Sequence, residues 1–551
     1  MITCIPVEIL DQICPHLSTD DYYQLVSASQ AFKKIFIPYM YKEVIFNTLE
    51  QAEAFIKTTS YHRYVRRLTI LQYGPNMNEL KTISDYFPNL ESINACCTKE
   101  IAWEEFDQPL HYLTSFACSR QLSKASLVNV LSNTPRLQKL DFVYFKSDHL
   151  DFSFFDTVHS LCPNLIDLSI TCSTWKQSIS LKEQELAQPA NTLKRLNIRK
   201  ERGENQHQAW LMYIGNKYPN IVSLKFEHEF FLYDRDMPEL HLAFYSWFLS
   251  KCQHLVSFEW KYVLPNAALI QQLKKMQRRF CRLVLYDPRA VDSGLLKPNC
   301  LPFLNDLKIL LPQWKPFNSL ISIISKAFPR LQHLSLEGGA RTYHIDMVLD
   351  QFLHLTSLEI QSLRLVVTKG RIEQQRRSAV PHPLKKIRLS CSRLFDEVFD
   401  YISVRCFELK QLTLDRVRFK TSAPKARIYL QQQELQRIEL NIFGRFVNHK
   451  TTQMQLLHVQ HKNRSSWYRT TLKNHYAPPI RPFKELDIRD IETLASLLSH
   501  DINPLPSSRQ LLFCPSSIFN DYDLLEVMEN GYLEIVCQSI DAIYIDKKRL
   551  I

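Results

Sequence analysis

The feature that most constrains this chain is an apolar pattern that recurs along it at a nearly constant spacing. The pattern reads apolar, two residues, apolar, one residue, apolar, and residues 162–170, CPNLIDLSI, show it as Leu165, Leu168 and Ile170. Successive copies mostly begin 23 to 29 residues apart, the length of a strand and a helix stacked as one repeat. The first apolar positions are Val65, Leu90, Leu113, Leu137, Leu165, Leu193, Ile221, Leu255, Phe280, Leu304, Leu331, Leu355, Leu384, Leu409, Leu435 and Phe483.

Proline marks the same units independently of the apolar pattern. Helical-looking segments such as SLVNVLSNT (126–134) and SLISIISKAF (319–328) precede it, and proline ends a helix because it lacks the N–H that would continue one. We therefore expect repeats of a short strand and a helix that stack into a continuous core. Proline stands two places before the first apolar position at six of the sixteen sites, where about one is expected by chance: Pro88, Pro135, Pro163, Pro219, Pro302 and Pro329.

Cysteine also recurs in these units, three places before the first apolar position, as Cys162, Cys252 and Cys406. Such a cysteine could be a reactive thiol, a metal ligand or a structural marker. A reactive thiol has no reason to recur at one offset, so the spacing favours a buried structural role.

The element CPNL at 162–165 resembles the cysteine-containing branch of the leucine-rich-repeat family, in which Cys-Pro-x-Leu precedes each strand. The resemblance implies an α/β fold, a leucine-rich-repeat solenoid with parallel strands on the concave face and helices outside. It covers residues 48–551.

The first part of the chain has a different pattern. In IPVEILDQICPHLSTDDYYQLVSASQAFKKIFIPYMY (5–41), apolar residues at helical spacing predict three short helices. Ser18 and Asp21 are spaced as a capping box for the second helix. Pro15 should kink or shorten the last turn of the first helix.

That order of residues resembles an F-box, with its apolar-Pro-x-Glu-Ile-Leu opening. The resemblance implies that residues 1–47 form an N-terminal three-helix F-box, which binds the Skp-type adaptor of a cullin ubiquitin ligase. The alternative is that these helices only cap the end of the solenoid. The residues that would contact or support the adaptor are Ile5, Pro6, Ile9, Leu10, Leu17, Leu25 and Phe32.

The composition argues against several classes of function. Only 9 glycines occur, without the GxxxxGK[ST] or GxGxxG loops of nucleotide-binding proteins. The longest apolar runs, such as FYSWFL (244–249), are far shorter than a membrane span, and the N-terminus lacks the basic region of a secretory signal. The 14 cysteines are scattered, which is typical of reduced thiols. We expect no cofactor and no membrane partner, and a location in the cytoplasm and/or the nucleus.

The sequence contains no recognisable catalytic or metal-binding motif. HExxH and GxSxG are absent, and no grouping of Ser, His and Asp is marked as a triad. His458 and His461 lie three apart, but no acidic or cysteine partner is near in sequence, so a solvated pair is the favoured interpretation. The chain is predicted to have no metal site and no catalytic residue of its own.

Basic charge is concentrated late in the chain. Residues 361–440 hold 17 Lys or Arg against 8 Asp or Glu, and residues 441–480 hold 6 against none. The long step between Leu435 and Phe483 suggests a basic loop insertion at about 444–481. It could be a solvated loop, a site for an acidic or phosphorylated protein, or, less favoured, a surface where Trp467 and Tyr468 stack on single-stranded nucleic acid.

Polar side chains between the repeat's apolar positions are predicted to line the concave face, among them Lys139, Asp141, Arg195, Asn197, Arg282, Lys308, His333, Glu359, Lys386, Arg388 and Arg437. The sequence thus predicts a non-catalytic substrate receptor of a ubiquitin ligase. The alternative is a leucine-rich-repeat scaffold that binds protein or RNA. The candidate substrate-binding residues are Arg282, Lys386, Arg388, Arg437, Arg464, Trp467 and Arg469.

Overall fold

The structure of the protein is a computed structural model, and its residues divide into two compact units, Met1–Gln272 and Leu273–Ile551. Each unit is described separately below. The structure describes residues 5–47, 49–71, 86–95, 110–144, 151–172, 188–200, 207–228, 242–260, 267–275, 280–285, 296–312, 315–338, 342–377, 380–391, 393–421, 425–447, 450–454, 456–462, 464–469, 484–486, 491–492, 494, 532–545 and 548–550.

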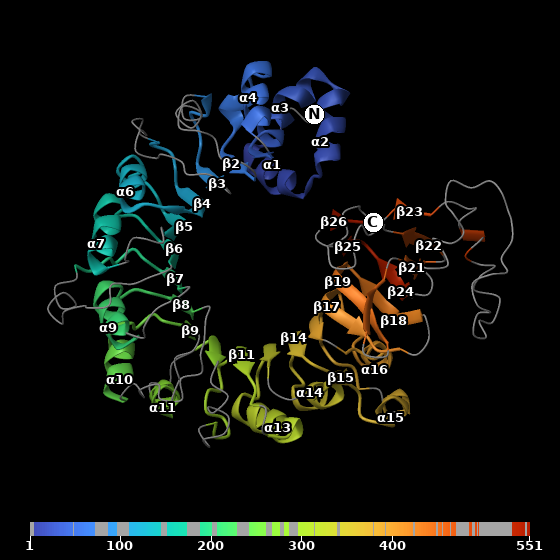
Figure 1. Ribbon diagram of the computed structural model, residues 1–551. Helices are drawn as coiled ribbons and strands as arrows, with labels where there is room; N and C mark the ends of the chain where they lie inside the picture. Colours follow the sequence, from blue (N-terminus) through green and yellow to red (C-terminus); the bar gives the residue numbers. More distant parts are fainter. Residues whose placement is uncertain are drawn as a thin grey trace. The chain divides into compact units, whose positions relative to one another are not determined.

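The first unit contains a ladder of parallel strands, each hydrogen-bonded to the next in chain order (Figure 1). Apolar residues pair with apolar residues across the strands, in buried rows such as Leu140↔Leu168↔Leu196 and Phe142↔Ile170↔Ile198. The strands are β1 (Glu43–Phe46), β2 (Arg67–Ile70), β3 (Ser92–Ala95), β4 (Ser115–Leu122), β5 (Lys139–Tyr144), β6 (Asp167–Cys172), β7 (Arg195–Lys200), β8 (Ser223–His228) and β9 (Ser257–Trp260).

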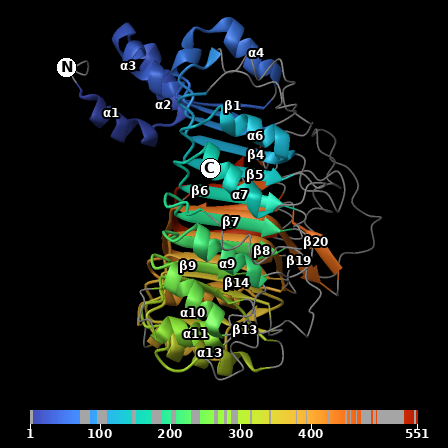
Figure 2. The same cartoon turned by 90° about the vertical axis from the view of Figure 1, so that its left-hand side faces the viewer.

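Helices follow many of these strands and lie together along one side of the ladder, as Figure 2 shows for α6, α7 and α9. Polar caps begin two of them: Ser123 Oγ accepts the N–H of Ser126 in α6, and Asp151 Oδ1 accepts that of Phe154 in α7. The helices on this side are α4 (Leu49–Thr58), α6 (Lys124–Ser132), α7 (Phe152–Leu161), α9 (His207–Lys217) and α10 (Leu242–Lys251); α11 (Ala267–Lys275) spans the boundary between the two units.

Three helices precede the first strand: α1 (Val7–Ile13), α2 (Thr19–Ala28) and α3 (Gln30–Met40). The predicted capping box is present, since Ser18 Oγ accepts the N–H of Asp21 while the Asp21 carboxylate accepts the N–H of Ser18. As expected from Pro15, α1 ends early and continues as a single 3₁₀ turn, η2 (Cys14–His16).

The second unit contains a second parallel ladder, with β26 (Lys548–Arg549) added antiparallel at its end. Leu334↔Leu358↔Ile387 shows the same apolar row as in the first unit. The parallel strands are β10 (Arg282–Leu285), β11 (Asp306–Leu310), β12 (His333–Glu337), β14 (Ser357–Ser362), β16 (Lys386–Cys391), β17 (Gln411–Phe419), β19 (Arg437–Val447) and β25 (Ile543–Ile545).

Helices and short strands connect the ladder strands of this unit. The predicted helix within 319–328 is α13 (Phe317–Ala327). The other connecting elements are α14 (Ile345–Gln351), α15 (Arg371–Arg377), α16 (Glu397–Arg405), the strand pair β13 (Tyr343–His344) and β15 (Leu365–Val366), and β20 (Lys450–Gln453), which pairs antiparallel with β19.

A separate five-stranded sheet takes the place of helices near the end of the chain. It has the order β18-β24-β21-β22-β23, and its β18 packs against α16. Its strands are β18 (Lys425–Leu435), β21 (Leu456–His461), β22 (Arg464–Arg469), β23 (Lys484–Glu485) and β24 (Tyr532–Ile540).

This sheet corrects two predictions. The segment expected to be a basic loop contains β20, β21 and β22 where the structure describes it, because β21 finds a parallel partner in β24, far away in sequence. The strand that follows β19 in the ladder is β25, whereas β23 pairs antiparallel with β22. The repeat assumed at Phe483 is therefore wrong, although Phe483 itself lies outside the described residues.

The repeat register itself is confirmed. Every predicted first apolar position that the structure describes, from Val65 to Leu435, is at most 2% exposed. At Leu165 the backbone N–H also donates to the carbonyl of Cys162, three residues earlier, at 3.2 Å. The same bond joins Leu409 to Cys406. Each such turn fixes where the next strand begins.

The recurring cysteines are structural, as predicted. Cys162 is 0% exposed, and its Sγ lies 3.6 Å from the carbonyl oxygen of Thr134 in the preceding repeat. Burial raises the pKa of the Cys162 thiol to about 12, so the nucleophilic thiolate does not form at neutral pH. Cys406 is equally buried, and its pKa is raised to about 12 for the same reason.

The stacked core predicts that two leucines, two residues apart, differ strongly in how much stability is lost when each is changed to alanine. Leu355→Ala should destabilise the second unit by about 2–5 kcal/mol, because Leu355 is 0% exposed and the change leaves a cavity. The matched control Leu353→Ala should cost less than about 1 kcal/mol, because that side chain is 57% exposed. Urea-unfolding midpoints measure both, and equal losses would contradict the assigned register.

Candidate interaction surfaces

The N-terminal helices form a small core of their own. Leu10, Cys14 and Phe36 are its buried residues. The hydroxyl of Tyr22 donates to the carbonyl oxygen of Cys14 at 2.7 Å, which joins α2 to the end of α1. Partly buried apolar residues complete this core: Ile5, Leu17, Tyr22, Leu25, Val26, Phe32, Ile35 and Tyr39.

The predicted adaptor-binding residues thus divide into two sets. Ile5, Leu10, Leu17, Leu25 and Phe32 belong to the core or pack against it, so they hold the helices together. The remaining two, Pro6 and Ile9, are exposed.

Apolar residues near Pro6 and Ile9 form an exposed stripe on α1. Ile9 is 43% exposed, and Ile13, one helical turn further on, is 45% exposed. Val7 is 58% exposed but points to another side of the helix, because it is two residues from Ile9. Ile13 was not among the predicted adaptor-binding residues, although its spacing places it on the same side of α1 as Ile9. We call Pro6, Ile9 and Ile13 the α1 stripe.

Side chains outside the α1 stripe connect the N-terminal helices to the start of the ladder. Lys42, just before β1, forms an ion pair with Asp11 of α1 at 3.8 Å. The ring of Tyr41 stacks on Tyr61 with centroids 5.1 Å apart and contacts Phe55 of α4 at 5.6 Å. The N-terminal helices are therefore anchored to the first repeats.

The face of each ladder opposite to the helices is polar, as predicted. Along β6 the side chains alternate between partly exposed and buried, so Asp167 and Ser169 lie on this strand face. They contact the next strand: Asp167 accepts from Arg195 at 2.9 Å, and Ser169 accepts from Asn197 at 3.2 Å. Lys225 on β8 pairs with Glu227 at 2.8 Å.

The predicted substrate-binding arginines of the second unit's strand face already have carboxylate partners. Arg282 pairs with Asp306 at 3.4 Å. Arg388 lies between Glu359 at 3.6 Å and Asp415 at 3.3 Å. These pairs offset the arginine charges, and exposed pairs of this kind contribute only about 0–1 kcal/mol to stability.

Two further predicted cations lie on the same face. Arg437 pairs with Glu439 and lies over the ring of Tyr544 at 4.3 Å. Lys386 is exposed and stands in register between Ser357 and Gln411, which are uncharged. Lys386 is therefore better placed than the arginines to attract an acidic partner.

The structure separates the three candidate residues of the basic segment, which all lie on β22. Arg464 is exposed and Arg469 is half-buried. Trp467 is only 8% exposed, its ring stacks on His458 at 4.2 Å, and it contacts Tyr532 at 5.2 Å. The indole is thus a packed part of the sheet.

The expectation of a solvated histidine pair is wrong for His458. His458 is 7% exposed, and its Nδ1 lies 3.3 Å from Glu534 Oε1. Glu534 is on β24, so the acidic partner comes from a distant part of the sequence that a local search does not reach. In the described part of the chain, no group of three His, Cys, Asp or Glu side chains could hold a metal ion.

No helix within the described ranges is long and apolar enough to cross a membrane.

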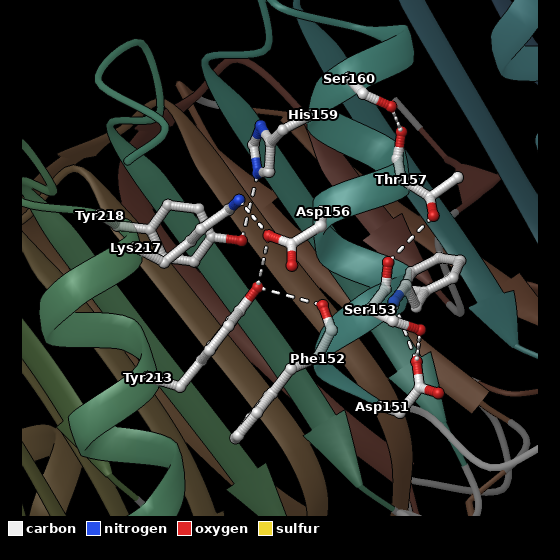
Figure 3. Close-up of polar contacts among 11 residues, drawn as sticks. Asp151, Phe152, Ser153, Asp156, Thr157, His159, Ser160, Tyr213, Lys217 and Tyr218 are labelled. Carbon is white, nitrogen blue, oxygen red and sulfur yellow. Dashed lines mark hydrogen bonds and ion pairs between the residues drawn. The ribbon is translucent and has the colours of Figure 1, made fainter. Parts of the chain in front are cut away.

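A buried lysine connects two helices of the first unit (Figure 3). Lys217 of α9 is 2% exposed and forms an ion pair with Asp156 of α7. The hydroxyl of Tyr213 donates to the carbonyl oxygen of Phe152 at 3.2 Å, and the two rings stack with centroids 3.9 Å apart. These contacts fix α9 against α7.

His159 lies in the same cluster. Its Nε2 is 3.1 Å from the hydroxyl of Tyr218, and the ring is 9% exposed. Burial, helped by the nearby positive charge of Lys217, lowers the pKa of His159 to about 3. The folded chain therefore holds this ring neutral at pH values where the unfolded chain protonates it.

Acid should weaken the first unit through His159. Because the ordinary pKa is 6.5 and the folded value is about 3, the unfolded chain binds the extra proton as the pH falls below 6.5. This group alone should lower the free energy of unfolding by about 2 kcal/mol between pH 7 and pH 5. Thermal unfolding of His159→Gln at the two pH values should show a smaller decrease than wild type.

The matched control for that experiment is His254→Gln, because His254 is an exposed histidine of the same unit. It should keep the wild-type decrease between pH 7 and pH 5. An unchanged decrease in His159→Gln would show that His159 does not stay neutral in the folded chain.

This protein matches no known family in sequence, and its similarity to the solved structures named below is low. No protein-family profile matches the chain, and no curated protein matches it in sequence. Among solved structures, the complex of Rad7 and Elc1 in yeast is similar at 17% identity and a TM-score of 0.39, over 65% of this chain and 90% of that one. The complex of TLR13 with ssRNA13 is similar at 14% identity and a TM-score of 0.37, over 70% and 65%. Similarities of this size do not indicate a function.

The class of protein follows instead from the architecture described above. Both units are α/β, with parallel strands in chain order, buried apolar rows along each ladder and a repeat of about 25 residues. This arrangement defines a repeat solenoid of the leucine-rich kind, a fold whose polar strand face is suited to binding other proteins.

Proposed function

We propose that this protein is the substrate-recognition adaptor of a cullin-type ubiquitin ligase. Residues 1–47 would act as an F-box that docks on a Skp-type adaptor, and the repeats would hold the target protein. Other subunits would transfer the ubiquitin, so the chain would be non-catalytic in that reaction. It would work in the cytoplasm and/or the nucleus.

The observation that carries this proposal is the α1 stripe. Ile9 and Ile13 are almost half exposed, although Leu10 on the same short helix is buried in the N-terminal core. Burying the exposed part of one such side chain against a partner would contribute about 1 kcal/mol. A contiguous exposed apolar patch on a packed, anchored element is typical of a protein-binding site.

The competing proposal, that α1–α3 only cap the ladder of a scaffold protein, explains this stripe less well. A cap turns its apolar side toward the neighbouring repeat and its polar side outward. Here the side of α1 that bears Ile9 and Ile13 remains exposed while α3 and Lys42 already connect the helices to the ladder. The stripe is therefore surplus to what capping requires.

The double variant Ile9→Asp with Ile13→Asp should lower recovery of the full-length chain on an immobilised Skp-type adaptor about tenfold or more, because charges replace two apolar anchors. A pull-down measures recovery, and circular dichroism checks that the helices persist. The matched control is Leu353→Asp, since Leu353 is 57% exposed on the other unit. Equal recovery of the wild type, the double variant and Leu353→Asp, or recovery of none of them, would contradict the F-box role.

For the target, we propose an acidic or phosphorylated protein segment that binds the strand face of the second unit near Lys386. Support comes from the net charge of the unit's central region, with 17 basic against 8 acidic residues in 361–440, and from the uncharged neighbours of Lys386. Nucleic acid is the less favoured partner, because the ring of Trp467 already stacks on His458.

Lys386→Ala should reduce binding of the full-length chain to an array of phosphopeptides about three- to tenfold. Arg388→Ala is the matched control and should change binding less than twofold, because Glu359 and Asp415 already offset that charge. Binding by the wild type should weaken as salt rises. A larger loss in Arg388→Ala, or binding that is independent of salt, would contradict this placement.

A further inference from the structure

Four polar or aromatic side chains form a row across the five-stranded sheet of the second unit. The register pairs Arg427 of β18 with Glu534 of β24, Glu534 with His458 of β21, and His458 with Trp467 of β22. Paired residues on neighbouring strands point to the same face, so the row is continuous. Neither the repeat architecture nor the proposed receptor role requires it.

Glu534 is the acidic member of this row, between Arg427 and His458. It is 5% exposed, and its Oε2 lies 2.7 Å from Lys425 Nζ and 3.4 Å from Arg427 Nε. Burial alone would raise the pKa of this carboxyl, but hydrogen bonds from His458 and Lys425 outweigh burial and lower it to about 2. Glu534 is therefore an ionised acceptor at neutral pH.

An ionised carboxylate determines which nitrogen of His458 carries the hydrogen. Because Glu534 Oε1 can only accept, Nδ1 at 3.3 Å donates to it, and in the tautomer with hydrogen on Nδ1 the other nitrogen, Nε2, is an acceptor. Ser465 Oγ, 2.8 Å from Nε2, is then the donor. Trp467, stacked on the imidazole at an interplanar angle of 9°, holds the ring in this orientation.

Ser465 lies next to this row, on the same face of β22 as Trp467, and is the accessible residue of the group. Its side chain is exposed, whereas His458 and Glu534 are 7% and 5% exposed. An exposed serine can donate to water, so the buried pair does not need it for its own stability. Gln460 stands opposite Ser465, and its amide Nε2 donates to His458 Nε2 at 3.5 Å, the same nitrogen that accepts from the Ser465 hydroxyl.

We propose that Ser465, His458 and Glu534 form a base-activated nucleophile that reacts with small carboxylic esters. His458 Nε2 accepts the Ser465 proton as Oγ forms a bond to the carbonyl carbon. The ester C–O bond then breaks, and the proton moves from His458 to the departing alkoxide. Glu534 keeps Nδ1 protonated and stabilises the transient imidazolium.

The two cations beside Glu534 set the size of the expected effect. They offset part of the carboxylate charge, so Glu534 stabilises the imidazolium less than an unpaired carboxylate would. We therefore expect activation near the lower end of what a positioned histidine gives, about a hundredfold. This activity is independent of the proposed receptor function, because it uses neither the α1 stripe nor the strand face.

The test uses an alkyl fluorophosphonate on the full-length chain, with peptide mapping by mass spectrometry. The serine Oγ forms a bond to phosphorus, fluoride leaves, and His458 takes the proton. Wild type should be labelled at Ser465, and Ser465→Ala should not be labelled there. His458→Gln should slow labelling about a hundredfold. Ser466→Ala, the matched control on the other face of β22, should be labelled at Ser465 at the wild-type rate.

Thermal unfolding of each variant shows whether it is folded. If His458→Gln does not fold, the comparison of wild type with its urea-unfolded form replaces it, because only the folded chain should be labelled. No labelling of folded wild type at Ser465, or labelling equal to that of Ser466 or of the unfolded chain, would overturn the proposal.

Discussion

The interaction on which the rest of the structure depends is the burial of apolar rows along each parallel ladder. No single strand and helix can bury its apolar side alone, so each repeat is stable only against its neighbours. The backbone bond from Leu165 to Cys162 shows how this burial is kept in register, since the turn places the first apolar residue of the strand in the core. The polar strand face follows directly, because side chains alternate along a strand.

Charge on that strand face is largely neutralised within the protein. Pairs such as Arg282 with Asp306 link adjacent strands, so the positive net charge of the sequence overstates the field that a partner would meet. Whether a basic side chain can attract a partner therefore depends on the residues next to it more than on the number of basic residues. Lys386 is a candidate binding residue because its neighbours in register are uncharged. The α1 stripe is a candidate for a different reason, because it is apolar but exposed.

Sequence reasoning predicted the repeat architecture well and the sites less completely. The period, the prolines and the recurring cysteines led to the correct strands as far as Leu435, because core burial leaves a local signature. The apolar spacing also predicted the three N-terminal helices, which precede β1. It did not separate core from surface among the adaptor-binding residues: Leu10 and Ile9 are both apolar, and only the packing of α1 on α3 buries one and exposes the other.

What the sequence by itself determined is everything that depends on local periodicity: the strand and helix units, the turns between them and the cap at Ser18. What only the tertiary structure decided is everything that depends on pairing across the chain. His458 looked like half of a solvated pair, yet β24 brings Glu534 beside it and β22 brings Ser465. The physical reason is that parallel pairing joins strands remote in sequence, so no local pattern records which side chains will meet.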